Sequence, residues 1–161
     1  MRGDMLSELR QTKPFAHPEE ELFLSLLRTA DLLGRRLGEL LRAKDLSPGQ
    51  YNVLRILRGA GKTGMPSGTI GPRMVTRDPD VTRLLDRLER RKLVTRGRNP
   101  GDRRVVSVRI AAAGLALLKT LDGPLVKIHR EQLGFLPSTA IRELLEHLTR
   151  IRQHLGRDKP G

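Results

Sequence analysis

Apolar residues recur three and four residues apart in three long stretches of this chain. Charged residues fill the positions between them, so a helix formed by each stretch has one apolar and one polar face. The apolar positions are Leu26, Ala30, Leu33, Leu37 and Leu40; Leu118, Leu121, Leu125 and Ile128; and Ile141, Leu144, Leu148, Ile151 and Leu155. The pattern predicts three long amphipathic helices, with a bend at Gly123–Pro124 in the second.

A shorter helix is predicted from residue 48, because its start carries three matching signals. Ser47 suits the capping position, Pro48 suits the first helical position, and Gln50 completes a capping box with the serine. The glycine-rich segment 59–64 ends this helix. Its expected buried side consists of Tyr51, Leu54, Ile56 and Leu57.

Two further helices are expected before residue 92. Ile70 and Met74 have core spacing and favour a short helix over residues 66–74, although two glycines and a proline within it weaken the pattern. Asp78–Pro79 opens the next helix as its cap and first turn. The expected buried stripe of that helix is Val81, Leu84, Leu85 and Leu88.

After Leu93 the apolar period changes from helix to strand. Residues 94–96 and 106–110 alternate apolar with polar side chains, as a half-buried strand does. Between them, Asn99–Asp102 places proline and glycine where a type II turn needs them. The pattern predicts a β-hairpin with a basic arm on each side.

The order of these elements defines the expected domains. Residues 1–18 form a flexible tail, 19–46 an N-terminal dimerisation helix, 47–110 a winged helix-turn-helix, 111–156 C-terminal dimerisation helices, and 157–161 a second tail. The small middle module cannot bury three long apolar stripes alone, so the terminal helices are expected to pack with those of a second copy. An intramolecular helical bundle is the alternative. The predicted fold is mainly α, with a small β-hairpin wing.

The charge of the chain limits the classes of partner that it is expected to bind. Lys and Arg number 31 against 18 Asp and Glu, which gives a formal net charge of +13 and favours nucleic acid or an anionic membrane. No stretch reaches the roughly 18 apolar residues that a membrane span needs. The chain has no cysteine, and a cytoplasmic protein is the simplest interpretation. With three Phe, one Tyr and no Trp it lacks a base-stacking platform, which favours duplex DNA over single strands.

The helix expected over residues 78–91 has the character of a recognition helix. Such a helix exposes short polar and basic groups near its N-terminus while its other face holds the fold together. Thr82 and Arg83 fall in the exposed first turns, and Arg87 lies one turn further on. Arginine reads guanine in the major groove with two hydrogen bonds, and threonine contacts a thymine methyl or a phosphate. An ordinary amphipathic surface helix has the same pattern, so this helix alone does not distinguish a DNA-binding helix from a surface helix.

The hairpin strengthens the case for DNA. Arg96, Arg98, Arg103 and Arg104 crowd around one tight turn that holds a single acid, Asp102. Exposed like charges this close repel each other unless an anion neutralises them. A narrow minor groove concentrates negative potential and attracts arginine. The alternative is a turn whose charges serve only solubility.

Together these segments are similar to the MarR family of bacterial transcription regulators. The similarity extends from Glu19 to Leu155 and is most specific in the wing. The residues that carry it are Val81–Glu89 leading into Leu93–Val94, then Asp102, Arg103 and Arg104 followed by Val108, Ile110 and Gly114. The resemblance implies a homodimer with one winged helix-turn-helix per subunit, the terminal helices forming the dimer interface. Many members are repressors that a small phenolic or acidic ligand releases.

The resemblance also implies roles for individual residues. Arg104 would enter the minor groove and Asp102 would orient it, while Thr82 and Arg83, with Thr76 and Arg77 before the helix, would contact the operator. The full set of expected DNA-contacting residues is Ser67, Thr76, Arg77, Thr82, Arg83, Arg87, Arg96, Arg98, Asp102, Arg103 and Arg104.

Three positions depart from the family pattern. Lys92 stands where a helix-ending glycine is usual, so a non-glycine residue is expected in the left-handed conformation. Ala111 replaces the threonine that usually caps the helix after the wing. Asp78–Pro79 lengthens the turn before the recognition helix by about one residue, which leaves the register of Thr76 and Arg77 open.

No catalytic or cofactor motif is present in the sequence. The four histidines are scattered, and Glu143 and His147 have no third partner at metal-ligand spacing. Gly61–Thr63 follows no predicted strand and is read as a turn rather than as a phosphate-binding loop. The expected function is a dimeric, sequence-specific regulator that binds duplex DNA, with no cofactor. The alternative is a non-specific architectural or RNA-associated basic protein.

Overall fold

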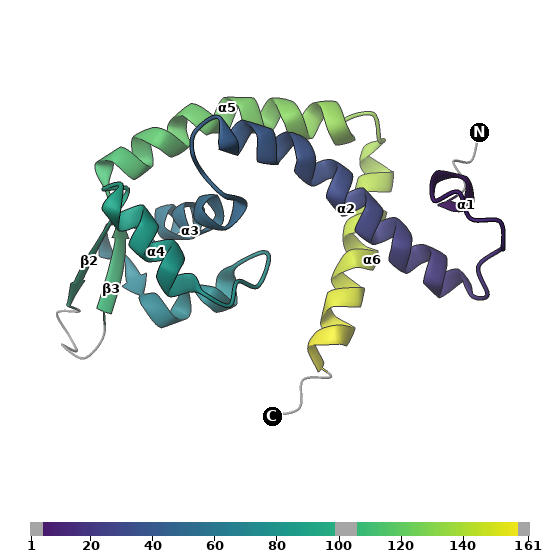
Figure 1. Cartoon of the computed structure of the whole chain (residues 1–161), viewed down its shortest axis with the longest axis horizontal. Helices are drawn as coiled ribbons and strands as arrows, with labels where there is room; N and C mark the ends of the chain where they lie inside the picture. Colours follow the sequence, from purple (N-terminus) through teal and green to yellow (C-terminus); the bar gives the residue numbers. More distant parts are fainter. Residues whose placement is uncertain (1–4, 99–105, 158–161) are drawn as a thin grey trace. The chain divides into compact units, whose positions relative to one another are not determined.

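The computed structural model describes residues 5–98 and 106–157. They form helices, three short strands and three single 3₁₀ turns (Figure 1), in the order α1 Met5–Glu8, α2 Pro18–Arg42, α3 Pro48–Gly59, η1 Gly61–Thr63, β1 Met65–Pro66, η2 Ser67–Thr69, η3 Gly71–Arg73, α4 Val81–Arg90, β2 Val94–Arg98, β3 Val106–Ile110, α5 Ala112–Leu133 and α6 Ser138–Arg157. The chain divides into two compact units, residues 1–122 and 123–161. The expected fold, mainly α with a small β-hairpin wing, is confirmed.

Helix α3 begins as its sequence predicts. The main-chain N–H of Gln50 donates to Ser47 Oγ at 3.1 Å, and the N–H of Ser47 donates to Gln50 Oε1 at 2.9 Å, so the capping box is complete. Its buried side differs in part from the expectation. Tyr51 and Ile56 are only half-buried. The core positions are Gln50, Val53, Leu54 and Leu57.

The helix expected over residues 66–74 is wrong. Met65–Pro66 instead forms strand β1, and two separate 3₁₀ turns, η2 and η3, follow it. Gly68, Gly71 and Pro72 explain the difference, because glycine disfavours helix and proline cannot continue a helical hydrogen-bond ladder. Ile70 is nevertheless fully buried between the two turns, as its core position predicts, while Met74 is only half-buried.

The β-hairpin is confirmed, and β1 adds a third strand that the sequence analysis missed. Strands β2 and β3 pair antiparallel from Val94 opposite Ile110 to Arg98 opposite Val106. Strand β1 pairs antiparallel with the other edge of β3, so the strand order is β1-β3-β2. The predicted turn Asn99–Asp102 lies outside the described residues.

Helix α4 starts later than the sequence analysis expected. Its N-cap is Asp80, whose carboxylate Oδ1 accepts from the main-chain N–H of Arg83 at 2.9 Å. Asp78 Oδ1 accepts from the N–H of Asp80 at 2.9 Å, so Asp78–Pro79 belongs to the preceding turn rather than to the helix. At the other end Lys92 has φ 55°, which confirms the expected left-handed residue.

Gly114 lies in the first turn of helix α5, against Leu93 and Ile110 of the recognition module. A Cβ at this position would meet the carbonyl oxygen of Leu93 at 2.3 Å and Ile110 Cγ1 at 2.9 Å. The same Leu93 carbonyl accepts from the N–H of Ala111 at 2.9 Å, so it cannot move away freely. A side chain therefore does not fit here, and this glycine lets the first turn of α5 pack on the segment between α4 and β2.

Helix α5 runs uninterrupted through Pro124, and the division between the two units falls beside this proline. Leu118 and Leu121 are buried in the first unit, and Leu125 and Ile128 are buried in the second. The predicted apolar stripe of α5 is therefore buried along its whole length.

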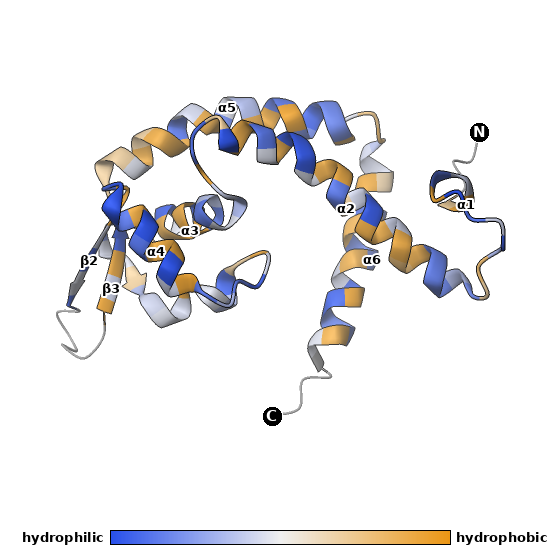
Figure 2. Cartoon of the chain, viewed as in Figure 1, coloured by the Kyte–Doolittle hydropathy of each residue, from blue (hydrophilic) through white to orange (hydrophobic). Residues whose placement is uncertain are grey.

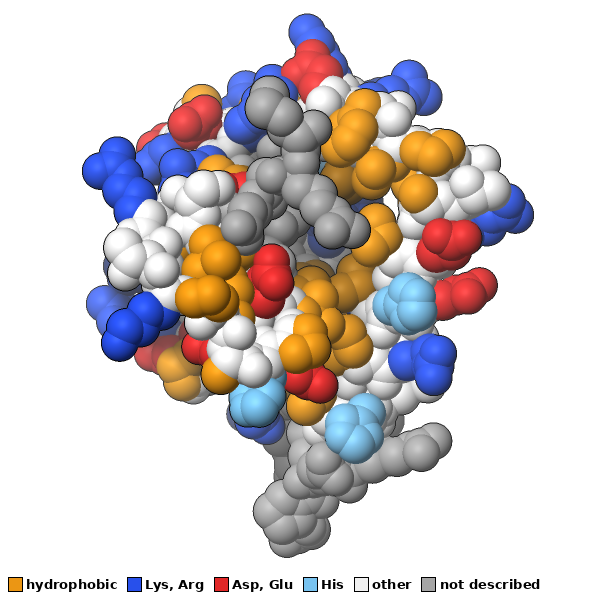
Figure 3. Space-filling model, turned by 90° about the vertical axis from the view of Figure 1, so that its right-hand side faces the viewer, with side chains coloured by type: hydrophobic (Ala, Val, Ile, Leu, Met, Phe, Trp, Pro, Cys, Tyr) orange, Lys and Arg blue, Asp and Glu red, His pale blue; other side chains and the backbone are white. Residues whose placement is uncertain are grey.

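Helices α2 and α6 each leave apolar side chains uncovered. Orange segments alternate with blue along both helices in Figure 2, as the periodic pattern predicts. Figure 3 shows hydrophobic side chains at the molecular surface among charged groups. The residues concerned are Leu22, Phe23, Leu26, Leu27 and Leu32 on α2, and Ile141, Leu144, Leu145 and Leu155 on α6.

Residues 5–17, part of the segment expected to be a flexible tail, contain one short helix. Residues Met5–Glu8 form the single-turn helix α1, and Met5 is only 5% exposed. Glu8 lies 4.0 Å from the guanidinium of Arg28 on α2. This segment has no helical repeat that the sequence analysis could have found, because a four-residue helix is too short to show one.

Candidate nucleic-acid interface

Helix α4 separates its buried and exposed faces sharply. Leu84, Leu85 and Leu88 are at most 8% exposed and hold the helix against the rest of the module. Thr82 and Arg83 in the first turn are exposed, and so is Arg87 one turn later. Because Asp80 caps the helix, its first turn is held in a defined conformation. This is the division of faces that a recognition helix requires.

Arg83 and Arg87 keep their charge available on this exposed face. Within the described part of the chain, the acidic side chains of α4 pair with Arg96 and not with either of these two arginines. Their guanidinium groups are therefore free to meet the phosphates or base edges of an incoming duplex.

The loop before α4 is anchored to α3 by one hydrogen bond. Asn52 Oδ1 accepts from the main-chain N–H of Val75 at 2.7 Å. Val75 itself is 89% exposed, and the following Thr76 and Arg77 are also exposed. This bond fixes the start of the loop that carries two of the expected contact residues. Ser67, at the start of η2, is half-buried.

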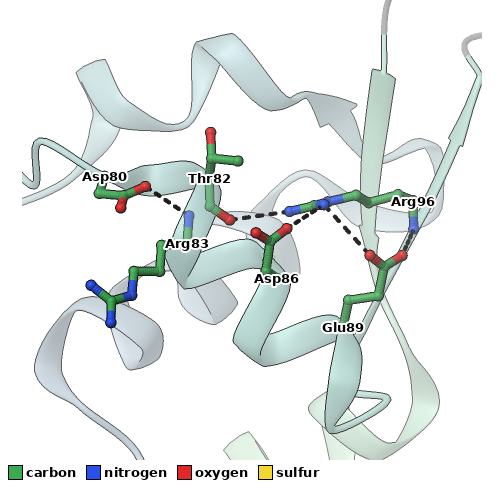
Figure 4. A network of polar contacts seen from close by, with 6 residues as sticks. All are labelled: Asp80, Thr82, Arg83, Asp86, Glu89 and Arg96. Atoms are coloured by element: carbon green, nitrogen blue, oxygen red, sulfur yellow. Dashed lines mark hydrogen bonds and ion pairs between the residues drawn. The ribbon is translucent and has the colours of Figure 1, made fainter.

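Arg96 is the predicted contact residue whose surroundings differ most from the expectation. Its side chain turns toward α4 and meets acidic groups there (Figure 4). It forms ion pairs with Asp86 at 2.6 Å and with Glu89 at 3.6 Å. The same side chain is only 23% exposed. The neighbouring Arg98, at the end of β2, is exposed. Asp102, Arg103 and Arg104 lie outside the described residues.

Strand alternation explains the position of Arg96. Val94 is 1% exposed on the inner face of β2, and residues two apart on a strand share a face. Arg96 also pairs with Val108, which is fully buried. An inward arginine needs acidic partners, and Asp86 and Glu89 supply them. The sequence therefore held a signal for this network, in the period-two alternation that begins at Val94.

Two arginines outside this face join the recognition module to its neighbours. The guanidinium of Arg91, just after α4, donates to the carbonyl oxygens of Lys44 and Asp45 in the loop between α2 and α3. Arg58 on α3 donates to both carboxylate oxygens of Asp122 on α5 at 2.9 Å. These bonds connect the recognition module to the loop between α2 and α3 and to helix α5.

The described residues show neither a metal site nor a membrane helix. No group of three His, Asp or Glu side chains in residues 5–98 and 106–157 is placed to hold a metal ion. Over the same residues, none of the helices is long and apolar enough to cross a bilayer.

Comparison with known proteins agrees with this geometry. The family model for the MarR family matches residues 46–106. A MarR transcription factor from Planctomyces limnophilus is 40% identical, with a TM-score of 0.65, and the match covers 84% of this chain and 98% of that one. The transcriptional regulator PecS of Dickeya dadantii is 28% identical over 95% of this chain and 93% of its own length. A mutant MarR from E. coli, solved in complex with operator DNA, shares the fold at 24% identity and a TM-score of 0.72, over 81% of this chain and 92% of that one.

The β2–β3 wing with its third strand β1, and the capped helix α4, define a winged helix-turn-helix DNA-binding protein. The match to the Planctomyces limnophilus protein covers 84% of this chain, which is more than this module alone. The chain belongs to the MarR family of DNA-binding transcriptional regulators. Its relatives are regulators and not enzymes.

Proposed function

We propose that this protein binds a pseudo-palindromic duplex operator as a homodimer and represses the genes beside it. The observation that carries the proposal is the first turn of α4, where Thr82 and Arg83 are exposed on a helix that Asp80 caps and three buried leucines hold. Arginine in this position makes two hydrogen bonds to guanine, which gives sequence preference and not affinity alone. Two such helices related by a two-fold axis would read half-sites roughly 10 base pairs apart.

The dimer is the second part of the proposal. Leu144 and Leu145 on α6 are 50% and 56% exposed, and Phe23 on α2 is 60% exposed. Apolar side chains gathered at this density on long helices favour burial in an interface. We assign residues 19–46 and 111–156 to dimerisation and residues 47–110 to DNA binding. A second copy of the chain supplies matching apolar faces, because a two-fold interface brings the same surface from each subunit.

The remaining residues complete the proposed DNA contacts. We assign Arg87 and Arg77 to phosphates beside the major groove, with Thr76 and Ser67 nearby as neutral donors. We assign Arg98 and Arg103 to phosphates beside the wing. Arg104 enters the minor groove, and Asp102 orients it, as the resemblance implies. Repression follows because a dimer bound across a promoter excludes other proteins from the same DNA.

Release by an effector is the third part of the proposal. A groove of about 540 Å³ lies between the C-terminal half of α2 and the start of α3, with two glycines of α2 opening space in it. Arg35 and Arg42 supply positive charge there. This lining favours a small acidic molecule, although Asp31 holds Arg35 at 2.6 Å and would compete with it.

The effector test is a titration of the protein–operator complex with small aromatic carboxylic acids. An acid that binds the groove is expected to lower operator affinity in the wild type and to lose this effect in Arg42→Ala. An acid that dissociates both complexes equally acts elsewhere, and the groove assignment would then be wrong.

The alternative function is a basic protein that binds any nucleic acid through its charge. It predicts comparable affinity for unrelated duplexes and a steep fall of affinity with salt from phosphate contacts alone. The net charge of +13 fits this alternative as well as it fits the regulator. The capped helix with a separate wing favours the regulator, because a non-specific binder needs no such arrangement.

Selection from a pool of random duplexes at physiological salt tests the proposed function. The bound molecules are sequenced after several rounds, and an inverted repeat with half-site centres roughly 10 base pairs apart is expected. Arg104→Ala should recover the same central bases with weaker binding and a loss of A·T preference at the flanks. Recovery of no common sequence by the wild-type protein would favour the non-specific binder.

A further inference from the structure

Arg96 connects the wing to the recognition helix through its side chain and its main chain (Figure 4). Its Nη1 forms ion pairs with Asp86 Oδ1 at 2.6 Å and with Glu89 Oε2 at 3.6 Å. Its Nη2 donates to the carbonyl oxygen of Thr82 at 3.2 Å. Its main-chain N–H donates to Glu89 Oε1 at 3.2 Å. One residue of β2 is therefore bonded to three residues of α4.

The three partners lie along one face of α4. Thr82, Asp86 and Glu89 are spaced four and three residues apart, so they follow one another over two helical turns. The planar guanidinium presents several N–H donors in fixed directions, which lets one arginine hold two partners in a defined geometry. A flexible ammonium group does not impose such an orientation. The contacts therefore restrain both the distance between strand and helix and the angle between them.

We propose that Arg96 is a positioning residue that sets the angle between the wing and the recognition helix and does not itself contact DNA. The inference rests on the proposed function, in which α4 reads the major groove while the wing reaches the adjacent minor groove. Both contacts form at once only when wing and helix have a fixed relative orientation. A wing released from α4 would lose entropy on binding each duplex, and its minor-groove preference would weaken.

The network has a second effect on the charge of the interface. Asp86 and Glu89 lie on the helix that approaches DNA, and two free carboxylates there would repel the phosphates. Arg96 neutralises them from the protein side. The Nε of Arg96 is buried without a hydrogen-bond partner among the described residues, which costs some of the stability that the ion pairs give. This balance agrees with a role in orientation more than in overall stability.

Arg98 provides the matched control for Arg96. It lies two residues further along β2, is exposed, and is assigned above to a phosphate contact. Loss of a phosphate contact weakens binding to all sequences equally and lowers the salt dependence. Loss of a positioning residue instead changes which bases the protein prefers. The two arginines therefore predict different results for the same substitution.

The test is random-duplex selection with the full-length wild type, Arg96→Met and Arg98→Met. We expect Arg96→Met to keep the central bases that α4 reads and to lose the A·T preference at the flanks. Arg98→Met is expected to keep both while binding more weakly throughout. If Arg96→Met recovers the wild-type sequence pattern, whether with wild-type or uniformly lower affinity, Arg96 does not position the wing. If the wild type selects no sequence, the proposed function itself fails.

Amide hydrogen exchange without DNA tests the same inference independently of the proposed function. Faster exchange is expected in residues 94–98 and 106–110 of Arg96→Met, with little change in α3. Unchanged exchange in both strands would contradict the proposal. Asp86→Asn serves as a second variant should Arg96→Met not fold, because it weakens the shortest ion pair and keeps the arginine. Asp86→Asn should also lose A·T preference at the flanks and exchange faster in β2 and β3, both to a smaller extent than Arg96→Met.

Discussion

Leu144→Glu on α6 is expected to abolish dimerisation and to lower affinity for the selected operator by about 100-fold or more. Leu144 is 50% exposed in the single chain and belongs to the apolar face of α6. A carboxylate buried at a subunit interface without a partner must be neutralised or exposed, and either outcome disfavours the dimer. Two linked reading modules gain roughly 10²–10⁴ in affinity over one, and a monomer loses this gain.

Sedimentation velocity gives the oligomeric state of this variant, and fluorescence anisotropy gives its affinity. Gln153→Glu is the control, because it adds the same charge on the opposite side of α6, where Gln153 is exposed. We expect it to remain a dimer with affinity close to that of the wild type. A Leu144→Glu protein that stays dimeric and binds normally would show that α6 is not part of the interface.

Arg83→Ala is expected to cost about 1–3 kcal/mol of binding free energy and to relax the base preference at one position of each half-site. This cost corresponds to about a 5- to 150-fold loss of affinity. The reason is that Arg83 is exposed in the first turn of α4 and makes no ion pair with the described acids of this helix. Its two hydrogen bonds to guanine have no substitute after truncation.

The comparison uses the selected duplex and a series with one base pair changed at a time. Arg90→Ala is the matched control, since Arg90 is exposed on the last turn of the same helix. We expect the control to lower affinity slightly and equally for all duplexes. Equal base preferences in the wild type and Arg83→Ala would remove Arg83 from the set of base-reading residues.

The sequence predicts the elements whose signals are local. The capping box of Ser47 and Gln50 uses groups three residues apart, and both of its hydrogen bonds are present. The leucine stripe of α4 is buried as its period predicts. These features depend on near neighbours in the chain, so the pattern contains the information that forms them.

The features that the sequence analysis missed depend on distant residues. Strand β1 forms because Met65 and Pro66 pair with residues of β3 some forty positions later. The pair Asp78–Pro79 predicts the start of α4 there, because aspartate suits a cap and proline suits the first helical position. The structure shows Asp80 in that role, with Asp78 holding the turn.

Arg96 carries two sequence signals that predict different surroundings for its side chain. Charge and proximity to a turn suggested a DNA contact, while the strand alternation from Val94 indicated an inward side chain. The second signal decided the structure, since the arginine meets Asp86 and Glu89 on the inner side of the sheet. Strand register explains the inward side chain of Arg96. It does not explain Arg98, which has the same register two residues further along, at the end of β2, and is exposed.

The most direct measurement is the ratio of two affinities at physiological salt: that for the selected duplex and that for a scrambled duplex of equal length and composition. A sequence-specific regulator predicts a ratio of about 10³–10⁷ in favour of the selected site. Scrambling leaves the phosphates unchanged, so the salt-dependent phosphate contacts contribute equally to both affinities. The ratio therefore reports base recognition and should exceed unity at every salt concentration. A ratio near unity, with both affinities falling together as salt rises, would contradict the account and leave a non-specific basic protein.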